Sequence, residues 1–235
     1  MTDRPTMMLT GGSRGIGADI ARAAQAAGWH ICLGLRNPTA IPEGLSSDHL
    51  DSFVYDATDR AAEAEWAQAV IERHGRIDAI VASAGLFTAE NIVEASEEEV
   101  DLLLEVNLRA PRRLAMAAWP ALQRSGRGRV VILGSLSGKR VASAGSGLYS
   151  VSKFAAVGLA HALRYEGWDA GIRATAICPG LVATDMGETA AKGARPTAEM
   201  TQPEEVAHLV MEAIGLSNTA SVPEIHINCR TDGIF

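Results

Sequence analysis

A tyrosine and a lysine lie at a spacing that acid–base chemistry can use. Tyr149 and Lys153 occur in the run LYSVSKFAAVGLAHAL, whose pattern predicts a helix, and an i, i+4 spacing puts both side chains on one helix face. An ammonium group near a phenol favours the phenolate, so the sequence predicts a lowered pKa for Tyr149. Such a tyrosine can donate a proton in carbonyl reduction and accept one in alcohol oxidation.

A serine is expected to approach the same place. Ser135 directly follows the apolar run RVVILG, which predicts a strand, and the helix carrying Tyr149 comes next in the chain. We expect the Ser135 hydroxyl to hold and polarise a substrate oxygen. We also expect Lys153 to bind ribose hydroxyls of a nucleotide.

A glycine-rich turn near the start of the chain predicts a phosphate site. Residues 10–17 read TGGSRGIG and join an apolar run to an alanine-rich helix pattern. Gly11, Gly15 and Gly17 permit a tight turn and a close backbone approach to a pyrophosphate at a helix N-terminus. Their spacing, G-x-x-x-G-x-G, differs from the commonest dinucleotide fingerprint. The alternative is a glycine turn that serves only the fold and binds no phosphate.

Two further segments favour a dinucleotide. Asp56, in DATD, is expected to end the third strand, where its carboxylate can accept a hydrogen bond from an adenine amino group. The alternative role, a helix cap, is already filled by Asp59. Residues 82–85, ASAG, end the fourth expected strand with small side chains, against which a flat ligand can lie.

Two arginines predict which dinucleotide is bound. The second expected strand ends in HICLGLRNP, without the carboxylate that NAD-specific sites place against the 2′-hydroxyl. A 2′-phosphate would meet Arg36 on one side and Arg14, from the glycine turn, on the other, and guanidinium groups suit phosphate oxygens. The sequence therefore predicts a preference for NADP(H) over NAD(H); a merely solvated Arg14 is the alternative.

The elements that must position these residues alternate along nearly the whole chain. Continuous apolar runs predict strands at 6–10, 30–35, 52–57, 79–83, 129–135, 173–178 and 224–228. Helical patterns lie near 16–28, 59–74, 97–125, 149–168 and 203–216. This order predicts an α/β fold, a single-domain Rossmann-like doubly wound fold with an about seven-stranded parallel sheet and helices on both faces. The segment 186–202 predicts a mobile lid, with a disordered insert over 187–200 as the alternative.

Composition limits the classes of protein that remain. A chain of 235 residues with 47% hydrophobic residues fits one domain over 1–235, and the net charge of −7 disfavours a non-specific nucleic-acid binder. No apolar run approaches a membrane span, and no signal peptide is recognised, so a cytoplasmic protein is expected. The six histidines show no ligand spacing, so no metal site is expected. The cysteines lie in strand-like runs and are expected to be buried and reduced: Cys32, Cys178 and Cys229.

Taken in order, the motifs resemble those of the short-chain dehydrogenases/reductases. The resemblance covers about residues 6–228. It rests on TGGSRGIG at 10–17, DAT at 56–58, ASAG at 82–85, Asn107 in EVNLRAP, Ser135 in GSLSG, YSVSK at 149–153 and CPGLVATDM at 178–186.

The resemblance implies four catalytic residues. Tyr149 would be the acid/base, and Lys153 would bind the nicotinamide ribose and lower the tyrosine pKa. Ser135, which matches the S-x-x-G pattern better than Ser137, would position the carbonyl. Asn107 would hold a water in a proton relay; without the resemblance, a helix kink or a surface polar role is an equal alternative.

The resemblance also implies a cofactor site. The PG-x-x-x-T segment would contact the nicotinamide carboxamide through Val182 and Thr184. The full set of expected cofactor contacts is Gly11, Ser13, Arg14, Gly15, Ile16, Gly17, Arg36, Asp56, Ala57, Ser83, Ala84, Gly85, Tyr149, Lys153, Pro179, Gly180, Val182 and Thr184.

Two departures from the family pattern affect the expected pocket. ASAG stands where Asn-Asn-Ala-Gly is common, so support for the sheet and cofactor pocket is weaker. The 14-residue interval from Ser135 to Tyr149 is one longer than usual, which indicates an insertion in a loop beside the substrate. Mostly apolar pocket candidates favour a small to medium hydrophobic carbonyl: Leu86, Phe87, Ser137, Val141, Leu181 and Met186.

The expected function is NADP(H)-dependent interconversion of a ketone or aldehyde with an alcohol by hydride transfer. A catalytically silent dinucleotide-binding regulator and a dehydratase or epimerase on the same scaffold are the alternatives. Family members are usually dimers or tetramers, so a homodimer or homotetramer acting on a small molecule is expected, with no nucleic-acid or membrane partner.

Overall fold

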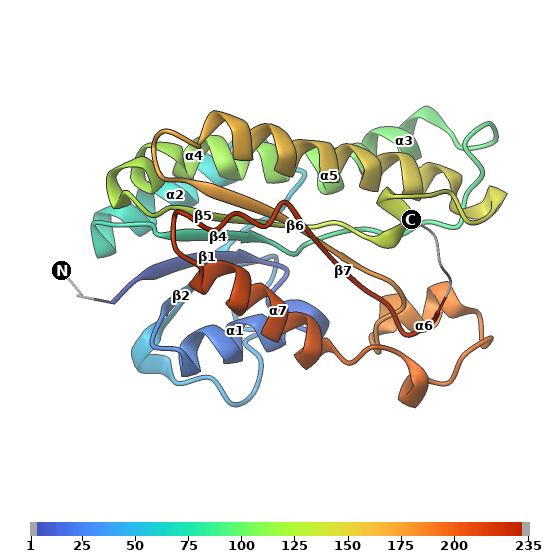
Figure 1. Ribbon diagram of the computed structural model, residues 1–235, viewed down its shortest axis with the longest axis horizontal. Coiled ribbons are helices and arrows are strands. Elements are labelled where there is room, and N and C mark those ends of the chain that lie inside the picture. Colours follow the sequence, from blue (N-terminus) through green and yellow to red (C-terminus); the bar gives the residue numbers. More distant parts are fainter. Residues whose placement is uncertain (1–3, 232–235) are drawn as a thin grey trace.

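Seven parallel strands form one central sheet in the computed structural model, which describes residues 4–231 (Figure 1). The strand order is β3-β2-β1-β4-β5-β6-β7, and every neighbouring pair is parallel. The strands are β1 (Thr6–Thr10), β2 (His30–Leu35), β3 (Leu50–Val54), β4 (Ala79–Ala82), β5 (Arg129–Leu133), β6 (Arg173–Pro179) and β7 (Glu224–Ile227). The doubly wound fold predicted from the strand–helix alternation is confirmed.

Helices cover both faces of the sheet (Figure 1). On one face lie α2 (Ala62–His74), α4 (Ala110–Ser125) and α5 (Gly147–Glu166), and on the other lie α1 (Gly15–Ala26) and α7 (Pro203–Gly215). Two shorter helices, α3 (Glu97–Leu104) and α6 (Asp185–Ala191), lie near one end of the molecule.

A separate hydrophobic cluster fills each side of the sheet. Continuous apolar strands make this possible, because β1 and β2 are buried along their whole length. Trp66 of α2 packs against β2 where Gly34 lacks a side chain: a Cβ there would lie 2.7 Å from the indole ring. On the opposite face, Ile20 of α1 and Val206 of α7 are fully buried.

Several element boundaries differ from the prediction by one to three residues, and two differences have causes that the structure shows. The third strand is Leu50–Val54, because the chain turns at Asp56, whose carboxylate accepts hydrogen bonds from the Thr58 N–H and hydroxyl. The helix expected over 97–125 is divided by a π-helical turn, Glu105–Arg109, between α3 and α4. Hydrophobic spacing cannot reveal this turn, since one extra residue per turn barely changes the pattern.

One alternative and one expectation are corrected. The alternative of a disordered insert over 187–200 is wrong, because this stretch holds most of α6 and a 3₁₀ turn, Thr197–Glu199, and buried Met200 and Thr201 anchor its end. The mobile lid over 186–202 stays a prediction. Cys229 lies beyond β7 and is half-buried, whereas Cys32 and Cys178 are buried as predicted. None of the described helices is long and apolar enough to cross a lipid bilayer.

Candidate functional site

Ser135 and α5 meet at the carboxyl end of β5. Ser135 follows β5 with an extended backbone, and its Oγ accepts a hydrogen bond from Ser137 N at 3.1 Å. The next turn packs closely on α5, because a Cβ at Gly138 would lie only 2.6 Å from the Lys153 carbonyl oxygen. This contact fixes Ser135 relative to the first two turns of α5, which carry Tyr149 and Lys153.

Tyr149 is buried, and its environment differs from the prediction. Burial raises the pKa of Tyr149 to about 12, although a side-chain hydrogen bond with Ser135 opposes the shift. The predicted lowering of its pKa is therefore wrong for the protein without ligand. Lys153 Nζ lies 5.7 Å from the centre of the Tyr149 ring, and burial outweighs what a charge there contributes. The ring of Phe87 meets Tyr149 edge-on at 5.1 Å.

Lys153 is held by the strand that ends next to it. Its Nζ donates a hydrogen bond to the Leu133 carbonyl oxygen at 2.7 Å, and only 6% of the residue is exposed. Burial lowers the pKa of Lys153 to about 8, so this ammonium loses its proton far more readily than a surface lysine. Whether Lys153 is protonated near neutral pH therefore depends on the groups around it.

The Asn107 side chain anchors the loop after β4. Its Oδ1 accepts from Leu86 N at 2.8 Å, and its Nδ2 donates to Leu86 O and to Ser152 Oγ, both at 3.0 Å. Both amide protons are thus engaged, so the Asn107 side chain has no remaining N–H to donate to a water. Ser152 Oγ in turn donates to the Tyr149 carbonyl oxygen at 2.7 Å.

Gly85 makes room for two of these groups. A Cβ on Gly85 would lie 3.3 Å from Asn107 Oδ1 and 3.6 Å from Lys153 Nζ. The predicted site residues from β5, α5 and the π-helical turn are therefore brought together at the end of β4.

The glycine turn packs against the end of β4. A Cβ on Gly11 would lie 2.7 Å from Ala84 N, and one on Gly17 would lie 2.2 Å from Gly11 O. Gly11 and Gly15 have φ angles of +70° and +53°, which glycine adopts readily. Ser13 is exposed in the turn, and Ile16 is half-buried at the start of α1.

The start of α1 is suited to hold an anion. Arg14 is the N-cap residue and supplies no side-chain cap, and no acidic residue lies in the first turn. The first amides of a helix have no partner within the helix, so they can donate to a phosphate. A dinucleotide pyrophosphate suits these free amides, and the glycines let the turn pack closely on the neighbouring backbone.

Thr10 has a part in this site that sequence reasoning missed. Its Oγ1 accepts from Ser83 N and from Ala84 N, both at 3.1 Å. This hydroxyl joins the ends of β1 and β4, where the usual asparagines of the family pattern are missing.

The two arginines expected at a 2′-phosphate have different partners in the structure. Arg36 is exposed just beyond β2 and, after the Thr58 hydrogen bonds, contributes to holding the pKa of Asp56 below its usual value. Arg14 Nη1 instead pairs with Asp185 Oδ2 at 2.5 Å, at the start of α6. Their side chains are 77% and 74% exposed, so this pair is solvated. Ala57, beside Asp56, is buried.

The segment after β6 approaches the glycine turn. A Cβ on Gly15 would lie 3.0 Å from Thr184 Cγ2. Thr184 caps α6, since its Oγ1 accepts from Gly187 N at 3.1 Å, and Val182 is buried. Pro179 ends β6, and its carbonyl oxygen accepts from Ser135 Oγ at 3.4 Å.

An open groove borders this side of the site. It is lined by Arg195, Asn228, Cys229, Arg230 and Thr231. The groove adjoins the segment after β6, because a Cβ on Gly180 would lie 2.4 Å from Asn228 Oδ1 and 3.3 Å from Leu136.

Comparisons with known proteins agree with this arrangement. A family model described as short chain dehydrogenase matches residues 5–195. An agropine synthesis reductase of Rhizobium rhizogenes is 36% identical over 237 residues, covering 98% of this chain and 54% of the reductase. The chain thus spans about half the length of that relative. The oxidoreductase UcpA of Salmonella typhimurium is 32% identical, with 94% of this chain and 84% of UcpA covered.

Solved structures show the same fold. An alcohol dehydrogenase from the archaeon Thermococcus sibiricus, complexed with 5-hydroxy-NADP, is 29% identical with a TM-score of 0.85, covering 97% of each chain. A short chain dehydrogenase from Burkholderia cenocepacia, in complex with NADP, is 29% identical with a TM-score of 0.86, covering 96% of each chain.

Proposed function

Because the chain belongs to the short-chain dehydrogenase family, we propose that it is an NADP(H)-dependent oxidoreductase that interconverts a ketone or aldehyde with an alcohol. The observation that carries the proposal is the convergence of Ser135, Tyr149 and Lys153 beside a glycine turn fit for a dinucleotide.

The residues that would hold the dinucleotide come from several strand ends. The glycine turn and the first amides of α1 face the pyrophosphate, and the small residues 83–85 leave space for a flat ring. The resemblance implies that Thr184 and Val182 would contact the nicotinamide carboxamide. When bound, the nicotinamide supplies or accepts the hydride.

The chain's own residues handle the proton and the substrate oxygen. Ser135 donates a hydrogen bond to the carbonyl oxygen and orients it toward Tyr149. Tyr149 gives its proton to that oxygen in reduction and takes it back in oxidation. Lys153 favours the phenolate left on Tyr149, and the Leu133 carbonyl holds the ammonium in place.

A preference for the phosphorylated cofactor rests on charge at the end of β2. Arg36 follows β2 without a carboxylate in the tripeptide Gly34-Leu35-Arg36, and the two neighbours at 29% identity were solved with NADP or its derivative. For Arg14 to contact the same 2′-phosphate, its ion pair with Asp185 must break. Charge-assisted contacts contribute about 1.5–3 kcal/mol each, so two of them correspond to a preference above about 100-fold.

Side-by-side kinetics with NADPH and NADH test the cofactor preference. We expect higher kcat/KM with NADPH, and we expect Leu35→Asp combined with Arg36→Leu to reverse the ranking. The double variant supplies an acceptor for a ribose diol and removes a phosphate donor. Equal or better efficiency with NADH in the unaltered protein would overturn the preference while leaving the oxidoreductase proposal intact.

A screen of carbonyls and alcohols with both cofactors tests the activity itself. Reduction must consume one NADPH per alcohol formed. A silent dinucleotide-binding regulator would bind NADPH without consuming it with any carbonyl. A dehydratase or epimerase would convert its substrate with no net change in NADPH.

A further inference from the structure

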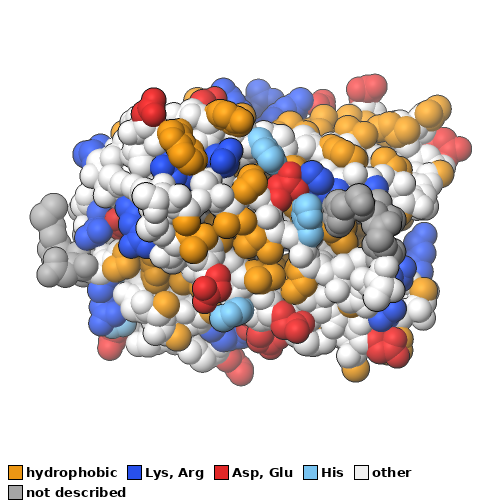
Figure 2. All heavy atoms as spheres, in the orientation of Figure 1, with side chains coloured by type: hydrophobic (Ala, Val, Ile, Leu, Met, Phe, Trp, Pro, Cys, Tyr) orange, Lys and Arg blue, Asp and Glu red, His pale blue; other side chains and the backbone are white. Residues whose placement is uncertain are grey.

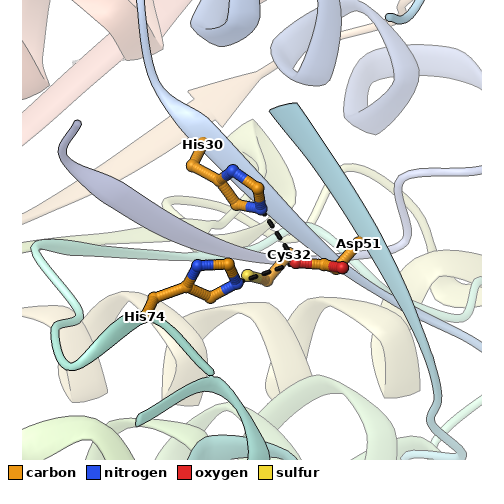
Figure 3. Close-up of side chains that lie close together, drawn as sticks. All are labelled: His30, Cys32, Asp51 and His74. Atoms are coloured by element: carbon orange, nitrogen blue, oxygen red, sulfur yellow. Dashed lines mark hydrogen bonds and ion pairs between the residues drawn. The ribbon is translucent and has the colours of Figure 1, made fainter. Parts of the chain in front are cut away.

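Four side chains that commonly bind metals meet at the end of the sheet opposite the dinucleotide site (Figure 3). His30 and Cys32 come from β2, Asp51 from β3, and His74 from the last residue of α2. One ligand atom from each lies within 4.8 Å of those of all the others. Sequence spacing gave no hint of this group.

The fold itself brings the four residues together. Cys32 and Asp51 are register partners on neighbouring parallel strands, so their side chains lie on one face of the sheet. His30 precedes Cys32 by two residues and shares that face. Gly75, in the left-handed conformation with φ +76°, ends α2 directly after His74 and sets where the imidazole lies.

The carboxylate lies at the centre of the group. Asp51 Oδ2 is 2.9 Å from His30 Nε2 and 2.7 Å from His74 Nε2. The Arg73 guanidinium donates to the other oxygen, Oδ1, and thereby orients the carboxylate. The side chains of His30 and His74 are 8% and 6% exposed, Asp51 is 18% exposed, and Cys32 is fully buried.

We propose that His30, Cys32, Asp51 and His74 form a binding site for a divalent cation of the zinc class. Two imidazoles, a thiolate and a carboxylate are a borderline-soft set that suits Zn²⁺ and not the oxygen-seeking Mg²⁺ or Ca²⁺. Four protein ligands in a buried cluster leave no open position, which is typical of a structural site and not of a catalytic one. The cation joins β2, β3 and α2.

Binding of the cation releases one proton from the site. The Cys32 thiol loses its proton to solvent as the metal–sulfur bond forms, and each neutral imidazole carries its proton on Nδ1 so that Nε2 can bind. The thiolate and the Asp51 carboxylate then supply two negative charges against the two of the cation, while the exposed Arg73 guanidinium stays paired with Asp51 Oδ1.

A second group with metal-ligand atoms is a poorer candidate. Cys178, Glu224 and His226 also lie within 4.8 Å of one another. However, Glu224 Oε1 accepts from Lys139 Nζ at 2.9 Å and from His161 Nε2 at 2.7 Å, so a cation there would displace a lysine. This group therefore serves as the comparison in the test.

The experiment measures metal content and cobalt spectra of the full chain without a histidine tag. We expect about one Zn²⁺ per chain after purification, or one Co²⁺ per chain after chelator treatment and reloading. Bound Co²⁺ should give the sulfur-to-cobalt charge-transfer absorption of a thiolate ligand and tetrahedral d–d bands. Cys32→Ser should abolish the charge-transfer band, and His74→Gln should weaken Zn²⁺ binding by more than about 100-fold in a chelator competition.

Matched controls separate this site from other thiols and imidazoles. Cys229→Ser and His208→Gln, at a half-buried cysteine and a 73% exposed histidine, should leave metal content and spectra unchanged. Circular dichroism checks that each variant is folded. Protein that binds no Zn²⁺ or Co²⁺ would overturn the proposal, and so would a band lost in Cys178→Ser but kept in Cys32→Ser. Neither result depends on oxidoreductase activity.

Discussion

Burial changes the pKa values of both Tyr149 and Lys153 from those that the two residues have on a surface. Burial moves the two pKa values apart, up to about 12 for the phenol and down to about 8 for the ammonium. Both neutral forms are favoured by the same apolar surroundings. A bound ligand that places a charge nearby therefore shifts the pKa values of both groups strongly.

Removing the Tyr149 hydroxyl should remove most of the activity. In Tyr149→Phe the ring still packs against Phe87, but no proton donor faces the substrate oxygen. We expect kcat to fall by about two to four orders of magnitude, with little change in cofactor affinity. Steady-state kinetics and a fluorescence titration of NADPH measure the two quantities. Near-full activity in this variant would refute the acid/base assignment.

The raised pKa of Tyr149 also predicts how the two directions depend on pH. Below a pKa of about 12 the phenol keeps its proton, so reduction should be flat between about pH 6 and 8. Oxidation needs the phenolate, so its kcat/KM should rise about tenfold per pH unit over the same range. Lys153→Met should lower oxidation further at each pH, since the charge favouring phenolate is gone. An oxidation rate that does not change with pH would contradict the assignment.

The two nearby serines should respond differently to the same substitution. Ser135 Oγ reaches both Tyr149 and the Pro179 carbonyl, whereas Ser137 contributes its backbone N–H to Ser135 Oγ. We expect Ser135→Ala to reduce kcat by about 10²–10³-fold and Ser137→Ala mainly to alter KM among substrates. Kinetics on a panel of carbonyls compare the two, and the reverse ranking would assign the oxygen-binding role to Ser137.

At the scale of the elements, burial on both faces made the strands predictable. β1 and β2 have the predicted bounds because helices cover both faces, so their residues are uniformly apolar. The π-helical turn at Asn107 was not predictable from residue spacing, and the side chain it carries bonds to Leu86 and Ser152, far away in the chain. The same holds for Cys32 facing Asp51, which depends on strand register.

A glycine-to-alanine substitution should have opposite effects on stability at two helical positions. Gly17→Ala should destabilise the protein by about 3 kcal/mol, because the new Cβ would lie 2.2 Å from Gly11 O. Gly215→Ala, at the end of α7, has nothing within 4 Å and should stabilise it by up to about 1 kcal/mol. Urea unfolding measures both changes. A neutral Gly17→Ala would show that the turn is looser than described.

At the scale of the whole molecule, exposed apolar side chains gather along α4 and α5. Met116, Val151 and Phe154 are 56%, 46% and 45% exposed, and Figure 2 shows hydrophobic side chains over the upper edge of the molecule. Exposed apolar side chains that gather on one surface often mark an interface between proteins. The patch supports the expectation of a homodimer or homotetramer joined through these helices.

A charge in this patch should weaken self-association. Phe154→Asp places a carboxylate in the expected interface and should raise the dimer dissociation constant by about 30-fold or more. Val54→Asp is the matched control, since Val54 is 71% exposed at the end of β3, away from α4 and α5. Light scattering after size-exclusion chromatography reports the mass. A monomeric unaltered protein, or equal masses for both variants, would contradict this interface.

The hydrogen bonds of Asn107 also set an order of events during protein synthesis. Its amide needs Leu86, made 21 residues earlier, and Ser152, made 45 residues later. At about 5–20 residues per second, the ribosome adds Ser152 roughly 2–9 s after Asn107. During that interval the nascent chain holds β1, β2, β3 and β4 without the α5 side chain that completes the π-helical turn. The catalytic centre therefore becomes complete only after α5 has left the ribosome.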